Sequence, residues 1–241
     1  MHEKTIFHLL GELMVERCGN LITQTVTDAC AAQKGEVDRI TTLAEKAFGS
    51  LQKPVVLTPE RREFLRQHTP QLAAAYKAAF KQRLADDSFE KRLPTVYSSG
   101  ASSVLTMQLT EVTAMQAVIS TGRLISLAEL VCEQELRFLI AQQIAYGIRR
   151  NVNPYRAETF VKALESAFED TFSGRHEWKA LMMSCGISFV RQLQIFLRFH
   201  NTVLERLLAE PGPEDSPPTL AQAASLAAFA DTEPMPPASK I

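Results

Sequence analysis

The stretch from Trp178 to Leu208, WKALMMSCGISFVRQLQIFLRFHNTVLERLL, decides the fold of this chain. At about 100° of helical rotation per residue, its large side chains fall on one stripe. The stripe consists of Trp178, Met182, Cys185, Phe189, Leu193, Phe196, His200, Val203 and Leu207, and it is widened by Leu181, Leu197, Phe199, Leu204 and Leu208. The apolar arc covers more than half of the circumference, which indicates a helix surrounded by other helices.

This helix would be about 46 Å long, so an elongated domain is expected. Polar side chains interrupt the run, which argues against a membrane span; they are Lys179, Arg191, Gln192, Gln194 and Arg198. The sequence therefore predicts an all-α fold, an elongated multi-helix bundle with this apolar helix at its centre.

The composition suits one globular domain, with 241 residues of which 46% are apolar. A formal net charge of −1 gives no general electrostatic reason for binding nucleic acid or an anionic membrane. Charged residues break the apolar run from Met1 to Leu13, so no signal peptide is predicted. No CxxC spacing occurs, and we expect reduced thiols in a cytoplasmic protein; the cysteines are Cys18, Cys30, Cys132 and Cys185.

Six helical segments are predicted in residues 1–210, which we interpret as a helical bundle domain. Two proline-containing caps position the third segment: Thr58-Pro59-Glu60 begins it, and Thr69-Pro70 predicts a restart. The segments are Glu3–Ala32 with a candidate break at Gly19-Asn20, Val37–Leu51, Thr58 to about Leu93, Leu109–Arg150 with an interruption at Ser120-Thr121-Gly122, a segment begun by Asn153-Pro154 and ended by Gly174, and Trp178–Leu208.

The segment after Asn153-Pro154 is amphipathic. One face is apolar, and the opposite face carries Glu158 and Lys162 at the spacing of an ion pair. The apolar residues are Ala157, Phe160, Val161, Leu164, Phe168 and Phe172. Such a segment packs its apolar face on the bundle.

Residues 211–241 are predicted to form a flexible tail. Seven of the twelve prolines lie between Pro211 and Pro237, which is typical of disorder. Within the tail, Thr219 to Ala230 (TLAQAASLAAFA) favours a short Ala-rich helix. Such a helix is too short to be stable alone in water and would order only against a surface.

Four stretches together resemble an uncharacterised bacterial family of large all-helical proteins. They are LTEVTAMQ (109–116), LAELVCEQELRFL (127–139), NPYRAETFVKA (153–163) and VLERLL (203–208). The resemblance covers roughly Glu60 to Pro213. Some members carry the label thymidine phosphorylase, but the family implies no established activity. The resemblance implies an all-helical fold. The sequence contains no Gly-rich phosphate-binding motif that would support a phosphorylase activity.

Glu135 is the most chemically suggestive residue of the chain. It falls between Val131, Phe138 and Leu139 on the apolar arc of its helix. Buried carboxylates with perturbed pKa values cluster at active sites. The alternative is an acid at a helix interface, satisfied by an arginine or histidine from a neighbouring helix. We favour this alternative, because one acid without a companion motif is poor evidence for catalysis.

His200 lies on the apolar stripe of the last helix and would meet Glu135 if the two helices are neighbours. A histidine there is more often a hydrogen-bonded core residue than a ligand or base. The remaining histidines lack metal-ligand spacing, so neither a metal nor another cofactor is expected.

A basic helix face is the third candidate site, formed by Arg62, Arg66, Lys77 and Lys81. A solvated helix face explains these residues adequately. A nucleic-acid footprint would need a stronger basic excess and a recognition element.

These observations favour a non-enzymatic helical protein that acts through protein–protein contacts or self-association. A regulator that binds nucleic acid or a nucleotide through the basic face is one alternative. A helical enzyme that uses Glu135 and His200 is another.

Overall fold

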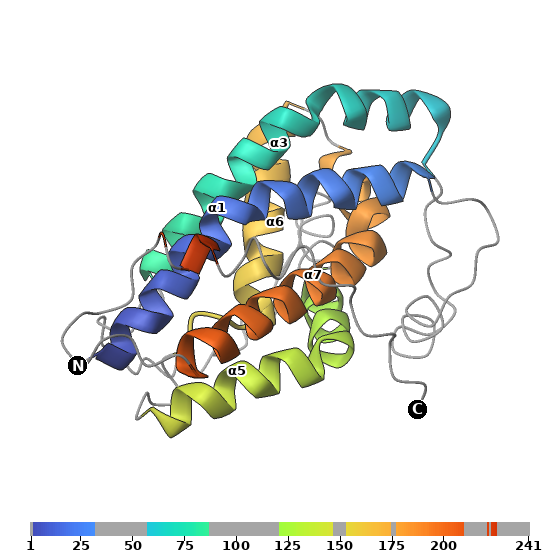
Figure 1. Ribbon diagram of the computed structural model, residues 1–241. Helices are drawn as coiled ribbons and strands as arrows, with labels where there is room; N and C mark the ends of the chain where they lie inside the picture. The colour runs from blue at the N-terminus through green and yellow to red at the C-terminus, as the bar shows by residue number, and fades with distance from the viewer. Residues whose placement is uncertain are drawn as a thin grey trace, which may run out of the picture.

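The fold is built of long helices packed around one another (Figure 1). The computed structural model describes residues 2–31, 57–86, 121–146, 153–174, 177–209, 221 and 223–225. Every regular element within these ranges is helical, which confirms the all-α prediction. The elements are α1 (His2–Ala31), α3 (Pro59–Asp86), a helix at residues 121–131, α5 (Glu133–Ala145), α6 (Ala157–Phe172) and α7 (Trp178–Ala209). The predicted Val37–Leu51 helix lies outside the described residues.

Helices α1, α3, α6 and α7 form a closed arrangement in which each packs on the next: α1 on α3, α3 on α6, α6 on α7 and α7 on α1. Aromatic rings from three of these helices meet inside it. Phe80 stacks on Phe160 with ring centroids 5.0 Å apart, and Tyr76 meets Phe189 edge-on at 6.1 Å. Phe160 in turn contacts Phe196. This aromatic cluster joins α3, α6 and α7 into one core.

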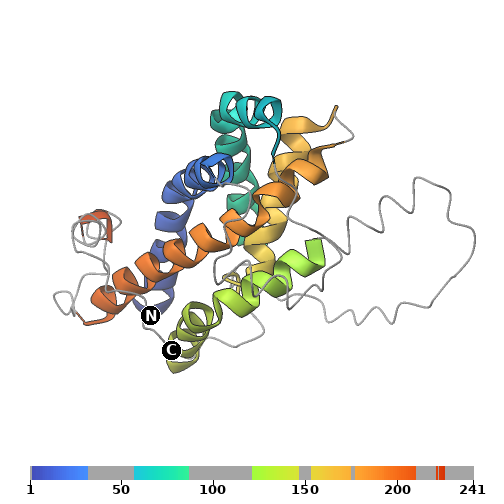
Figure 2. The same cartoon turned by 90° about the vertical axis from the view of Figure 1, so that its right-hand side faces the viewer.

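Helix α7 begins at the predicted residue, and its apolar stripe is buried as expected, except that Trp178 is only half-buried. Phe189 and Leu193 are fully enclosed, and Phe196 is buried. The apolar arc predicts a helix surrounded by other helices. Helices α5 and α6 do contact α7, but its most extensive packing is with α1, and α7 lies between α1 and α5 (Figure 2).

Helix α1 continues through Gly19-Asn20, so the candidate break at this position is wrong. Burial on both sides of the pair explains the continuity, because Cys18, Leu21 and Ile22 are all buried. A glycine inside a helix costs only about 1 kcal/mol relative to alanine. Packing of α1 against both α3 and α7 outweighs that cost.

Helix α3 also continues through Pro70, and the predicted restart is wrong. The start at Pro59 is confirmed, and the Thr58 hydroxyl accepts a hydrogen bond from the Arg61 amide at 3.4 Å. Proline inside a helix removes one backbone donor. Next to this missing backbone hydrogen bond, the Thr69 hydroxyl donates to the Leu65 carbonyl at 2.8 Å. Buried apolar residues on both sides of Pro70 then hold the helix on the core.

Helix α6 begins at Ala157, three residues later than Asn153-Pro154 predicts. Asn153 does not cap the helix. Its Oδ1 instead accepts from the Tyr155 amide at 2.9 Å and from Gln143 Nε2 at 3.1 Å. The rest of the prediction is confirmed: the apolar face is buried, and Lys162 Nζ lies 2.6 Å from Glu158 Oε1. The helix ends at Phe172, two residues before Gly174.

The interruption predicted at residues 120–122 is not found in its described part, because Thr121 and Gly122 are helical. The described discontinuity is at Cys132, where φ is −96° and ψ is 18°. Hydrogen bonds from the Cys132 amide to Ala128 and from the Leu136 amide to Cys132 bridge it at 2.9 Å. The chain bends there and continues as α5 (Figure 1).

The predicted tail lies mostly outside the described residues. Residues 221 and 223–225 are helical, within the short helix predicted for Thr219–Ala230, and Ala223 is fully buried in the common core. This part of the tail therefore packs on the bundle, as a short helix must in order to be stable.

Candidate functional site

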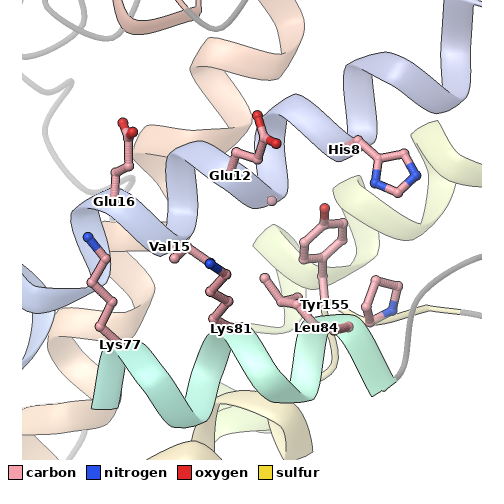
Figure 3. Close-up of a pocket in the computed structure, with 11 residues that line it drawn as sticks. His8, Glu12, Val15, Glu16, Lys77, Lys81, Leu84 and Tyr155 are labelled. Carbon is pink, nitrogen blue, oxygen red and sulfur yellow. The ribbon is translucent and has the colours of Figure 1, made fainter. Parts of the chain in front are cut away.

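A groove of about 650 Å³ runs between α1 and α3 (Figure 3). This volume lies in the range of about 300–1,000 Å³ typical of ligand pockets. Its walls are helical faces, and Pro154 and Tyr155, which precede α6, complete it. Helix α1 contributes His8, Gly11, Glu12, Val15 and Glu16, and α3 contributes Lys77, Lys81, Leu84 and Ala85.

Two rows of opposite charge border this α1–α3 groove. Glu12 and Glu16 lie one turn apart on α1, and Lys77 and Lys81 lie one turn apart on α3. All four side chains are exposed. Figure 3 shows both lysines extending from α3 toward α1, while the carboxylates of Glu12 and Glu16 project from α1 on the side away from α3. Within the described ranges, none of the four makes an ion pair or side-chain hydrogen bond.

Tyr155 packs under α1 at one side of the groove. Its hydroxyl donates to the Phe7 carbonyl at 2.6 Å. This approach favours a glycine at position 11, because a Cβ there would lie in tight contact, 3.0 Å from the Tyr155 hydroxyl oxygen. Burial raises the pKa of Tyr155, so the hydroxyl stays protonated and acts as a donor. Tyr155 therefore adds a neutral ring to the groove, and together with Val15 and Leu84 it forms what we call the apolar floor.

The predicted basic face divides into two unlike parts. Lys77 and Lys81 line the α1–α3 groove, but Arg62 and Arg66 lie near the other end of α1 beside Cys30. Arg62 Nε donates to the Leu57 carbonyl at 3.1 Å, and Arg66 lies 3.8 Å from Glu63. Of the four residues of the predicted basic face, only Lys77 and Lys81 therefore line the groove.

Glu135 is buried, with 5% of its side chain exposed, as its place on the apolar arc predicted. Arg198 Nε donates to Glu135 Oε1 at 2.5 Å, and Asn201 Nδ2 donates to the Glu135 backbone carbonyl at 3.0 Å. Among the described residues, Oε2 has no hydrogen-bond partner. The arrangement matches the interpretation of Glu135 as an interface acid paired with an arginine.

His200 is fully buried, and its Nδ1 lies 2.7 Å from the Phe196 carbonyl. Its ring packs against Phe196 and Phe199, with centroids 4.2 and 5.1 Å away. The hydrogen bonds of Glu135 go to Arg198 and Asn201, so the suggested meeting of Glu135 with His200 is not found within the described part of the chain.

The four cysteines are buried free thiols. Burial raises the pKa of Cys18 to about 12, against a smaller lowering by Lys77, and burial likewise raises the pKa of Cys185 to about 12. Thiols held protonated are poor nucleophiles and poor metal ligands. In the described ranges, no group of three or more His, Cys, Asp or Glu residues is arranged to hold a metal ion.

Helix α7 is long and apolar enough to cross a membrane by length and composition alone. More than half of the qualifying window is buried inside the fold, which is also the property of a core helix.

Comparisons with protein-family models, with curated proteins and with solved structures found no match to this chain. The resemblance to the large all-helical bacterial family stays an expectation.

Sequence reasoning identified Lys77 and Lys81 but missed the rest of the groove. Glu12 and Glu16 are a one-turn pair in the sequence, which is detectable but common on solvated helices. Tyr155 could not be found in this way, because its role depends on α1 crossing above it.

Proposed function

We propose that the protein acts by binding another polypeptide in the α1–α3 groove and that it is not an enzyme. The observation that carries the proposal is the pair of charge rows beside an apolar floor. Glu12 and Glu16 face solvent on one wall, and Lys77 and Lys81 do so on the other. A polypeptide can supply both signs of charge and an apolar surface in one segment.

The phosphate-binding alternative has weaker support. A nucleotide or nucleic acid approaching Lys77 and Lys81 would also approach Glu12 and Glu16, which repel it. Nucleic-acid affinity depends on the number of phosphates that are neutralised, and acids on the opposite wall reduce that gain.

The enzymatic alternative also has weaker support. A general acid or base must come within hydrogen-bond reach of its substrate. His200 is fully buried, and Glu135 is both buried and paired with Arg198. A substrate would have to displace core packing to reach either group.

Site-specific photo-crosslinking in the cell that naturally makes the protein tests this proposal. A photoreactive amino acid replaces Ala85, which is exposed and lines the groove. The matched control replaces Ala141, an exposed alanine on α5. Both substitutions leave the four charged side chains of the groove intact.

We expect a discrete polypeptide adduct from position 85 and none from position 141. An adduct of the same mass and yield from both positions would indicate non-specific contact. Either that result or the absence of any adduct at position 85 would contradict the proposal.

A further inference from the structure

We infer that the partner enters the α1–α3 groove as an amphipathic helix with acidic residues on one flank and basic residues on the other. This inference rests on the proposed function. It adds the secondary structure of the partner and the polarity of its charges.

The volume of the groove fits a short length of helix. A helix about 10 Å in diameter that rises 1.5 Å per residue occupies about 120 Å³ per residue. A groove of about 650 Å³ therefore matches between one and two fully embedded turns, or a longer helix that is half embedded. The groove is bordered by helices on both sides, so a third helix can pack along them with ordinary helix–helix geometry.

The charge spacing also matches a helix. Glu12 and Glu16 are separated by four residues, as are Lys77 and Lys81, which corresponds to about 6 Å along each helix axis. A partner helix lying along the groove repeats side chains at the same interval. Acids at i and i+4 on its one flank would face the lysines, and bases at i and i+4 on its other flank would face the carboxylates.

The apolar floor of the groove would be complementary to an apolar ridge on the partner helix, between its two charged flanks. Val15, Leu84 and Tyr155 supply apolar surface there. Burial of this surface is needed, because exposed ion pairs are screened by water and each contributes little. A small zwitterion would make one or two such pairs without the apolar area, so the geometry favours a macromolecular segment.

A displayed library of helical peptides tests the inference on the full chain. The peptides carry a fixed leucine ridge, and each flank position varies between Lys and Glu. The library is selected against the wild-type protein and against a polarity-inverted variant. That variant combines Glu12→Lys, Glu16→Lys, Lys77→Glu and Lys81→Glu, which leaves the net charge unchanged.

We expect the wild-type protein to enrich peptides with acids on one flank and bases on the other. The inverted variant should enrich the mirrored pattern, and each selected peptide should bind its own protein at least about tenfold more tightly than the other. A parallel library with a central proline, which breaks the helix, should give no enrichment.

Several outcomes would overturn the inference. They are enrichment of a single sign of charge, the same pattern on both proteins, equal enrichment of the proline library, or no enrichment. If the inverted variant loses its helical circular dichroism, the Lys77→Gln, Lys81→Gln variant replaces it. Acids should then lose their enrichment while bases keep theirs, and unchanged selection of acids would contradict the inference.

The crosslinking experiment and the peptide selection distinguish failure of the proposed function from failure of this inference. An adduct at position 85 without a two-signed helical consensus would leave the polypeptide-binding function standing and remove only the helix and its polarity. The absence of an adduct would remove the function itself.

Discussion

Arg198 on α7 donates a hydrogen bond to the buried carboxylate of Glu135 on α5 at 2.5 Å. A second bond joins the same two helices, because Asn201 donates to the Glu135 carbonyl at 3.0 Å. Gln194 on α7 also donates to the carbonyl of Val131, the last residue of the preceding helix, at 2.8 Å. The residue that most resembled a catalytic acid therefore attaches α5 to the central helix.

Replacing Arg198 with alanine should destabilise the protein by about 1–3 kcal/mol, because a buried carboxylate loses its charged donor. Urea denaturation measures the difference. Arg137→Ala is the control, because Arg137 is 77% exposed and pairs with Glu133 on the surface of α5. Equal stability of the two variants would show that the Arg198 contact contributes little.

Phe189→Ala and Phe196→Ala should each cost about 3–5 kcal/mol, since both rings belong to the aromatic cluster and leave a cavity when removed. Ile195→Ala on the same helix should cost far less, because Ile195 is 38% exposed. Thermal melts of the three variants provide the measurement. Wild-type melting of both phenylalanine variants would mean that the α7 stripe is not a core.

Gly11→Ala should destabilise the protein by about 1–3 kcal/mol, because the new Cβ crowds the Tyr155 hydroxyl. Gly19→Ala in the same helix is a matched control. A Cβ at position 19 would have no other atom of the described residues within 4 Å, apart from the neighbouring backbone of α1. Because alanine favours a helix more than glycine does, Gly19→Ala should stabilise the protein by roughly 0.5–1 kcal/mol.

Adding Tyr155→Phe to Gly11→Ala removes the crowded oxygen and should restore part of the loss. Chemical denaturation of the single and double variants gives the coupling between the two positions. Strictly additive losses would indicate that Tyr155 and Gly11 do not constrain each other.

The stability of the protein should fall in alkaline solution partly through Cys18. Burial raises its pKa from 9.0 to about 12, so the folded state disfavours the thiolate. The contribution to the free energy of unfolding is complete below pH 9 and is lost as the pH rises toward 12, by up to roughly 1.4 kcal/mol per pH unit. Urea midpoints between pH 8 and pH 11 should decline more steeply for wild type than for Cys18→Ala. Parallel curves would show that Cys18 ionises as easily folded as unfolded.

Helices were predictable where the apolar period was clear, as in α6 and α7. The errors came from local signals that packing overrides. Glycine and proline often end helices. Gly19 and Pro70 nevertheless lie inside long helices, which are held on the core by buried residues on both sides of each position. Asn153-Pro154 resembles a cap, yet the Asn153 side chain bonds to Gln143, which the sequence could not associate with it.

The candidate sites were harder to predict, because they depend on pairs of residues distant in the sequence. Burial of Glu135 followed from its position on the helix, but its pairing with Arg198 depends on the contact between α5 and α7. Lys77 and Lys81 were recognised as basic, but their opposition to Glu12 and Glu16 depends on how α1 and α3 pack.

The most direct measurement of the central claim is the yield of the position-85 adduct after the groove lysines are reversed. Lys77→Glu with Lys81→Glu should lower that yield by about tenfold or more, since two attractions become repulsions. The control, Arg66→Glu with Arg137→Glu, makes the same charge change outside the groove and should leave the yield unchanged. Equal yields from the two double variants would contradict the claim that the charged walls of the α1–α3 groove bind the partner.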